Sequence, residues 1–234
     1  MSFEQFDALV FELVTVMQFS ILVPMVVVWA RRRNFSPPVK VLSLYVYISA
    51  FFALSARLSA IYLHNNLLFL IGFNVAKVLL LVAVYRLVLT APRTRRLLAI
   101  ATLAGLGIVA ASFVLGLPRA VTVSRVVQCA LLAGFALAYL EQGLNRTDNR
   151  RFNGDPIWLL SVGQLIYSAA TVSTFSIEIV TLFKGSIFNT FSALSFSLAS
   201  LVFNYFLTLA FLRATPGVPP RLVAPNVESR LVAS

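Results

Sequence analysis

Seven long apolar segments, separated by short polar turns, dominate the hydrophobic pattern of the chain. A bilayer core about 30 Å thick requires about 20 apolar residues at 1.5 Å each. Lipid offers no partner for unpaired backbone groups, so each spanning segment must be helical. The pattern therefore predicts an all-α, polytopic membrane protein. The predicted membrane helices cover residues 6–30, 40–62, 67–90, 97–116, 120–142, 156–183 and 187–212.

Composition supports the same conclusion. Of 234 residues, 59% are apolar and 12% are charged, against roughly 25% charged in soluble domains. A soluble globular protein is therefore excluded, and too few residues remain for a second, water-soluble domain. We expect a seven-helix transmembrane domain over 1–213 and a disordered, proline-rich cytoplasmic tail over 214–234.

The basic residues predict the orientation, because Lys and Arg gather in cytoplasmic loops. Of the 19 Lys and Arg, 13 follow the first, third, fifth and seventh segments, while the opposite loops carry only Arg119 and Lys184. The N-terminus is therefore expected outside and the C-terminus in the cytoplasm. This topology accounts for most of the net charge of +11, so no nucleic-acid partner is expected.

A weak internal repeat relates the first three segments to the last three. Gln18 is followed 11 residues later by an aromatic residue, and so is Gln128. Tyr47 and Tyr85 lie 38 residues apart, as do Tyr167 and Tyr205 in the other half. This spacing is compatible with two parallel triple-helix repeats joined by the fourth helix. Chance similarity between apolar helices is the alternative.

Polar groups within the predicted spans are the candidate functional residues, since ionisable side chains in the membrane are costly. Two interpretations stay open: a structural salt-bridge network with arginines reaching the headgroups, or a water-filled, outward-facing pocket that binds a polar or anionic group. Asn189 lies at a depth in the membrane similar to that of the candidate residues named next. The candidate ligand-binding residues are Glu12, Gln18, Arg57, Asn74, Lys77, Arg125, Gln128 and Glu178.

Lys77 is the most informative of these candidates. It lies near the middle of the third predicted helix, too deep for its ammonium to reach the headgroups comfortably. Asn74, three residues earlier, shares its helix face. We expect Lys77 to be paired with an acidic residue, and Glu12 and Glu178 are the two acids in the spans away from the cytoplasmic ends.

Several specific chemistries are disfavoured by the sequence. Rhodopsin pigments carry a Schiff-base lysine in their seventh helix, whereas 187–212 contains no lysine. One cysteine and one histidine argue against a metal centre. No His-rich box, Gly-x-Ser-x-Gly or phosphate-binding glycine loop occurs. We therefore expect a non-enzymatic protein without a cofactor.

Three short stretches carry a resemblance to a family. They are His64-Asn65-Asn66-Leu67 with the later Val84-Tyr85-Arg86, Asp155-Pro156-Ile157-Trp158 with Leu165-Ile166-Tyr167, and Phe203-Asn204-Tyr205-Phe206-Leu207-Thr208. Together they resemble uncharacterised seven-helix membrane proteins common in Bacteroidetes-type bacteria. The resemblance implies a bacterial inner-membrane location and brings no established activity. That family often carries an acidic residue near the position of Lys77, where the charge is here reversed.

A looser likeness, in helix count and repeat only, links the chain to SWEET-type sugar carriers, although their Pro-Gln loop signature is absent. Three functions follow as hypotheses. The first is a receptor-like protein that binds a small polar or anionic ligand in an outward-facing pocket, with any signalling passing through a separate cytoplasmic partner. The second is a small-solute uniporter built on the two repeats. The third is an intramembrane lipid-modifying enzyme, with Glu12 or Glu178 as general base.

Overall fold

The computed structural model is all-helical and describes residues 3–32, 35–144, 155–180 and 186–214, without the side chains of 3–4, 175–180, 186–189 and 192. Within these residues, seven helices are long and apolar enough to cross a membrane, the first of them formed by α1 and α2 together. The elements are α1 (Phe3–Ser20), α2 (Leu22–Arg31), α3 (Pro37–Tyr62), α4 (Leu67–Val88), α5 (Pro92–Ser112), a 3-10 turn (Phe113–Leu115), α6 (Leu117–Leu144), α7 (Pro156–Val180) and α8 (Ser186–Arg213).

The seven predicted spans are confirmed, with one addition: the first span is interrupted at Ile21. Pro24 explains the interruption, because proline lacks an N–H group and its ring crowds the carbonyl four residues earlier, that of Ser20. Ser20 Oγ donates to the Met17 carbonyl at 2.6 Å and accepts a 2.6 Å hydrogen bond from Asn204 of α8. The hydrogen bond between Asn204 and Ser20 thus joins the interrupted part of the first span to α8.

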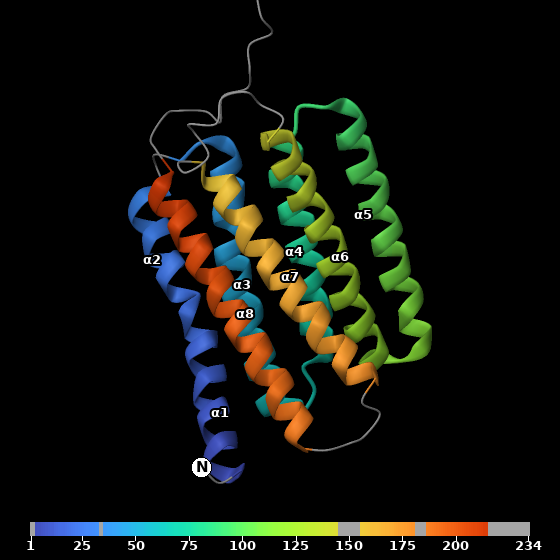
Figure 1. The fold of residues 1–234 in the computed structure, drawn as a ribbon. Coiled ribbons are helices and arrows are strands. Elements are labelled where there is room, and N and C mark those ends of the chain that lie inside the picture. Colours follow the sequence, from blue (N-terminus) through green and yellow to red (C-terminus); the bar gives the residue numbers. More distant parts are fainter. Residues whose placement is uncertain (1–2, 33–34, 145–154, 181–185, 215–234) are drawn as a thin grey trace, which may run out of the picture.

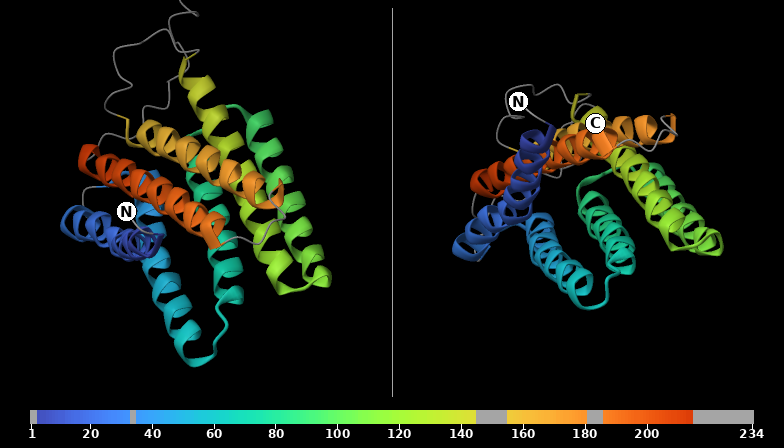
Figure 2. Two further views of the ribbon diagram at one scale, coloured as in Figure 1. Left: turned by 60° about the horizontal axis from the view of Figure 1, so that its bottom comes forward. Right: turned by 90° about the horizontal axis from the view of Figure 1, so that it is seen from below.

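The helices form a bundle in which α8 packs between the α1–α2 pair and α7, α6 links α7 to α4, and α4 packs on α3 (Figure 1). α5 lies at the edge, against α6. At the end where residues 63–66 join α3 to α4, here called the hairpin end, this pair diverges from α1 and α8 (Figure 2). At the other end, here called the basic end, Arg31, Arg95 and Arg213 lie at or near helix termini.

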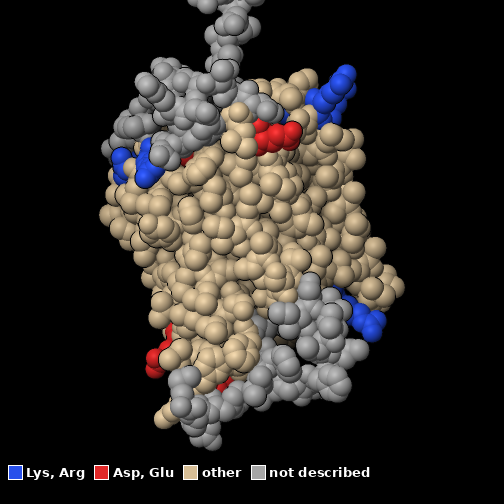
Figure 3. All heavy atoms as spheres, viewed as in Figure 1, with Lys and Arg blue, Asp and Glu red and all other residues tan. Residues whose placement is uncertain are grey.

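The polarity of the bundle is the reverse of that of a soluble protein. Large apolar side chains such as Phe11, Trp29 and Leu103 are 70–82% exposed, whereas Gln128 and Ser161 are fully buried. On the face drawn in Figure 3, charged residues lie near the two ends, separated by a broad band without them. Apolar surface of this extent is suited to lipid. The chain is an integral membrane protein.

Hydrogen bonds between helices hold the core of the bundle. Asn74 of α4 donates to Ser124 of α6 at 2.9 Å, and the Tyr85 hydroxyl of α4 lies 3.0 Å from the Ser161 hydroxyl of α7. α7 and α8 approach closely where Gly163 faces Phe206: a Cβ at position 163 would lie 2.6 Å from the Phe206 Cβ. Only a glycine permits this separation of the two helices.

The basic end is closed by direct contacts. The rings of Phe35 and Phe211 stack with their centroids 5.5 Å apart, and Arg31 donates to the Leu212 carbonyl at the end of α8. Asp155 caps α7 by accepting a 2.9 Å hydrogen bond from the Ile157 N–H. The predicted tail begins at this end, and residues 215–234 of it lie outside the described residues.

Candidate functional site

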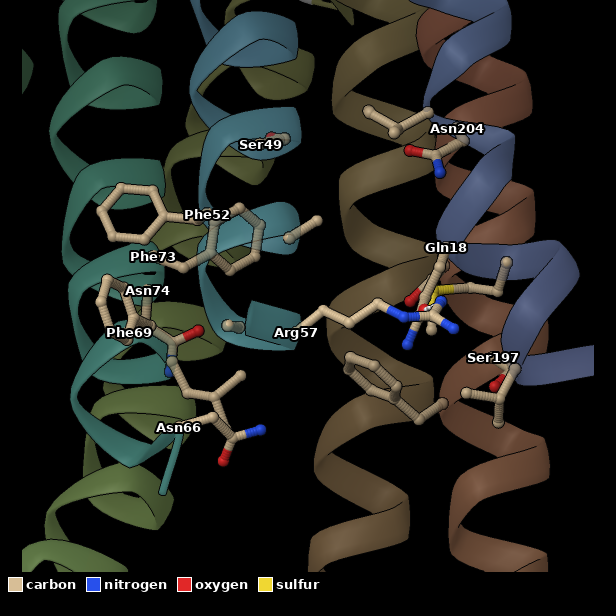
Figure 4. Close-up of a pocket in the computed structure, with 18 of the residues that line it drawn as sticks. Gln18, Ser49, Phe52, Arg57, Asn66, Phe69, Phe73, Asn74, Ser197 and Asn204 are labelled. Carbon is tan, nitrogen blue, oxygen red and sulfur yellow. Dashed lines mark hydrogen bonds between the residues drawn. The ribbon is translucent and has the colours of Figure 1, made fainter. Parts of the chain in front are cut away.

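A cavity of about 600 Å³ occupies the half of the bundle nearer the hairpin end. Its described lining comes from α1, α3, α4 and α8, with single residues from α6 and α7 (Figure 4). On α4 the lining extends from Phe69 to Lys77. Lys77 follows the start of α4 by ten residues, so at 1.5 Å per residue the cavity reaches about 15 Å into the bundle.

Lys77 lies at the deep end of this cavity, surrounded by aromatic rings. Its ammonium is 3.9 Å from the ring centroid of Tyr167, 4.3 Å from that of Phe203 and 5.8 Å from that of Tyr45. These rings come from α7, α8 and α3, so four helices converge on one cation. The side chain is 2% exposed. A cation over ring faces is stabilised by their negative quadrupole.

The expected acidic partner for Lys77 is not Glu12. Glu12 is exposed on α1 and does not line the cavity, and within the described residues no ion pair reaches Lys77. The side chain of Glu178 lies outside the described residues. The Glu12 half of the prediction is wrong, and the described groups closest to the ammonium are instead π faces, which carry no formal charge and which a search for carboxylates overlooks. Pairing with Glu178 stays a prediction.

Four further candidates do line the cavity together with Lys77. Gln18, Arg57 and Asn74 project into it (Figure 4). Arg125 also lines it, with its guanidinium carbon 5.0 Å from the ring centroid of Phe196. The fold therefore brings together predicted site residues from α1, α3, α4 and α6.

Gln128 is a candidate that the fold separates from this cavity. It is fully buried on α6, does not line the cavity, and neither its Nε2 nor its Oε1 has a hydrogen-bond partner. Its role as a ligand-binding residue of this cavity is therefore not retained. Asn189 is placed in α8, but its side chain lies outside the described residues.

The cavity is bounded unevenly. α4, α6, α7 and α8 pack in sequence behind it, and α1 packs on α8, whereas no comparable packing joins α1 to α3 among the described residues. A hydrogen bond between two described residues crosses this gap: Arg57 Nη1 of α3 donates to Gln18 Oε1 of α1 at 3.2 Å (Figure 4). Both side chains are exposed. Packed helices thus form the wall of the cavity on one side. On the other side, between α1 and α3, the Arg57 side chain crosses the gap.

Two buried hydroxyl groups in the lining lack partners. Ser49 of α3 and Ser197 of α8 are 6% and 0% exposed, and neither Oγ has a hydrogen-bond partner. Burial of a polar group without a partner is unfavourable by a few kcal/mol. These groups are therefore available to a ligand or to water in the cavity.

Sequence reasoning missed these serines and the three rings around Lys77. Tyr167 and Phe203 occur in stretches noted for the repeat or the family resemblance, but nothing in the sequence placed either ring beside Lys77. Tyr45, Ser49 and Ser197 offered no signal besides their position in a span. The chemistry of the described lining is nevertheless simple. It contains three cationic side chains and no carboxylate, and no cluster of metal-ligating side chains occurs in the described part of the chain. The arrangement is suited to an anion with an apolar portion.

No protein-family model, curated protein or solved structure matches this chain.

Proposed function

We propose that the chain is a non-enzymatic, receptor-like membrane protein that binds a small anionic ligand in the cavity. The observation that carries this proposal is the deep position of Lys77, whose ammonium faces a cavity without a carboxylate among its described lining residues. Asn74, Ser49 and Ser197 supply nearby hydrogen-bonding groups. A cavity of about 600 Å³ falls within the usual range for small-molecule sites.

The cavity is proposed to face outward, in the inner membrane of a bacterium. The concentration of Lys and Arg at the basic end supports a cytoplasmic location for that end, and the cavity lies at the opposite end. A reporter fused after Ser234 is expected to be cytoplasmic, while a tag before Ser2 is expected to be accessible from outside. Both termini on the same side would contradict the seven-span topology.

The binding proposal is tested with a panel of water-soluble anions, using benzoate as the main probe and benzyl alcohol as its uncharged counterpart. Ligand that binds only the folded protein stabilises it by about 2.7 kcal/mol at a hundredfold excess over Kd. Benzoate, but not benzyl alcohol, is expected to raise Tm. Lys77→Met should abolish the rise. Lys40→Met removes a charge from an exposed site outside the cavity and should leave the rise unchanged.

A small-solute uniporter is the second candidate. It is favoured by the interruption of the first span at Ile21, because Ile21 itself lines the cavity and broken helices beside a mid-membrane site are typical of transporters. The two triple-helix repeats remain a prediction that this candidate requires. Uptake of benzoate into proteoliposomes, abolished by Lys77→Met, would favour the uniporter, whereas binding without uptake would favour the receptor.

A further inference from the structure

The cavity has a side opening within the membrane-spanning region. Its α1 wall includes Phe11 and Val14, and its α3 wall includes Ala53, Ala56 and Ala60. Phe11 is 73% exposed, and Ala53 and Ala60 are also exposed. The alanines recur every three or four residues, so they share one helix face, and their small side chains leave the space beside α1 unfilled. At the hairpin end, α3 and α4 diverge from α1 and α8 (Figure 2).

The two ends of the space differ in chemistry. Toward Lys77, the lining provides an ammonium and the unpartnered hydroxyls of Ser49 and Ser197. Between that polar end and the hairpin end, the α3–α4 wall includes the rings of Phe52 and Phe73 together with the polar side chains of Arg57, Asn66 and Asn74 (Figure 4). A matching ligand carries its anion at one end and an apolar body behind it.

A diacyl phospholipid in its normal position does not satisfy this arrangement. Its headgroup would stay at the membrane surface and its chains would point toward the bilayer centre. Lys77 lies about 15 Å beyond the start of α4 and would meet those chains. A single-chain amphiphile can instead insert its anionic group first. The anionic group then replaces its contacts with water by contacts with the Lys77 ammonium and the serine hydroxyls.

We infer that the ligand is a single-chain amphipathic carboxylate that inserts its carboxylate first from the hairpin end, so that the carboxylate lies at Lys77 and the chain lies along the alanine face, open to the bilayer between α1 and α3. This inference rests on the proposed function and adds the ligand class and the entry route. The hydrogen bond between Arg57 and Gln18 crosses the entry, so it must open for the chain to pass. The Arg57 guanidinium then contacts the bound ligand at the end of the cavity nearer the hairpin end.

The test uses the full chain in nanodiscs of zwitterionic phosphatidylcholine, with decanoate as probe, benzoate as the water-soluble comparator and decylamine as the cationic counterpart. Decanoate is expected to bind at least tenfold more tightly than benzoate, after correction for partition into empty nanodiscs, and decylamine is expected not to bind. Ala56→Phe should weaken decanoate binding at least tenfold and change benzoate binding less than twofold, because it fills the side opening and spares the site around Lys77.

The matched control is Leu54→Phe, which adds an aromatic ring to an exposed position of α3 outside the cavity lining and should leave both ligands unaffected. If Ala56→Phe does not fold, Ala60→Phe replaces it on the same helix face. Benzoate binding with no preference for decanoate, or decanoate binding that both alanine variants leave unchanged, would overturn the amphiphile inference but leave the proposed function standing. Absence of binding by either anion would overturn both.

Discussion

Substitution of Lys77 tests whether the aromatic rings offset the burial of its charge. A lysine at the centre of a membrane helix costs about 2.5–3.5 kcal/mol on insertion scales. Cation–π contacts contribute about 0.5–2 kcal/mol each, and two of the three rings lie within 4.3 Å of the ammonium. The two effects are of similar size, so Lys77→Met should lower the free energy of unfolding by no more than about 1.5 kcal/mol.

Lys77→Glu should behave quite differently from Lys77→Met. The buried carboxylate has the same unfavourable desolvation as the ammonium but makes no cation–π contact. It also faces the negative π surfaces of Tyr167 and Phe203. The expected loss is at least about 3 kcal/mol, which corresponds to a fall in Tm of about 6–12 °C for a chain of this size.

The measurement is thermal unfolding followed by a thiol-reactive fluorescent dye. Cys129 is the single cysteine of the chain and is 1% exposed, so its reaction reports loss of the folded state. Equal stability of the Met and Glu variants would refute the role of the rings. A loss above about 3 kcal/mol for Lys77→Met would show that the ammonium has a stronger stabilising partner than the aromatic contacts supply.

Three further experiments test the packing, each measured by the same unfolding assay. Gln128→Leu removes a buried amide that lacks partners and should stabilise the fold by about 1–3 kcal/mol; destabilisation would indicate a bound water or ligand at the amide. A double-mutant cycle of Asn74→Ala and Ser124→Ala should give a coupling of about 0.6 kcal/mol, the average for hydrogen bonds between membrane helices, and a value near zero would contradict the contact. Gly163→Ala should destabilise by about 1–3 kcal/mol by forcing α7 from α8, whereas Gly134→Ala, with no atom within 4 Å of the added Cβ, should not destabilise.

The membrane helices were predictable because lipid imposes one simple rule on length and hydrophobicity. The predicted span 67–90 corresponds to α4 at Leu67–Val88, and the predicted span 120–142 lies inside α6. The interruption at Ile21 was not predicted, although Pro24 was visible in the sequence. Proline is tolerated in membrane helices when neighbouring groups compensate, and the Ser20–Asn204 contact that does so joins positions 184 residues apart.

The candidate site was predictable in its charged members but not in their partners. Arg57, Lys77 and Arg125 stand out because charge is rare in a span. The rings of Tyr45 and Phe203 do not stand out, since α3 and α8 are apolar on every side and their rotation cannot be read from hydrophobic periodicity. Only the packed arrangement of four helices shows which aromatic residues face Lys77.

The packing of α1 on α8 has a consequence for biogenesis. Segments leave the ribosome in sequence order, so α1 enters the membrane first and its principal neighbour enters last. Until then, the groups of α1 that contact α8, including Ser20 at the helix break, must reside in lipid or pair with the insertion machinery. A chain released before α8 would expose the ammonium of Lys77 to the bilayer without the ring of Phe203. Such truncated chains should be strong substrates for membrane quality-control proteases.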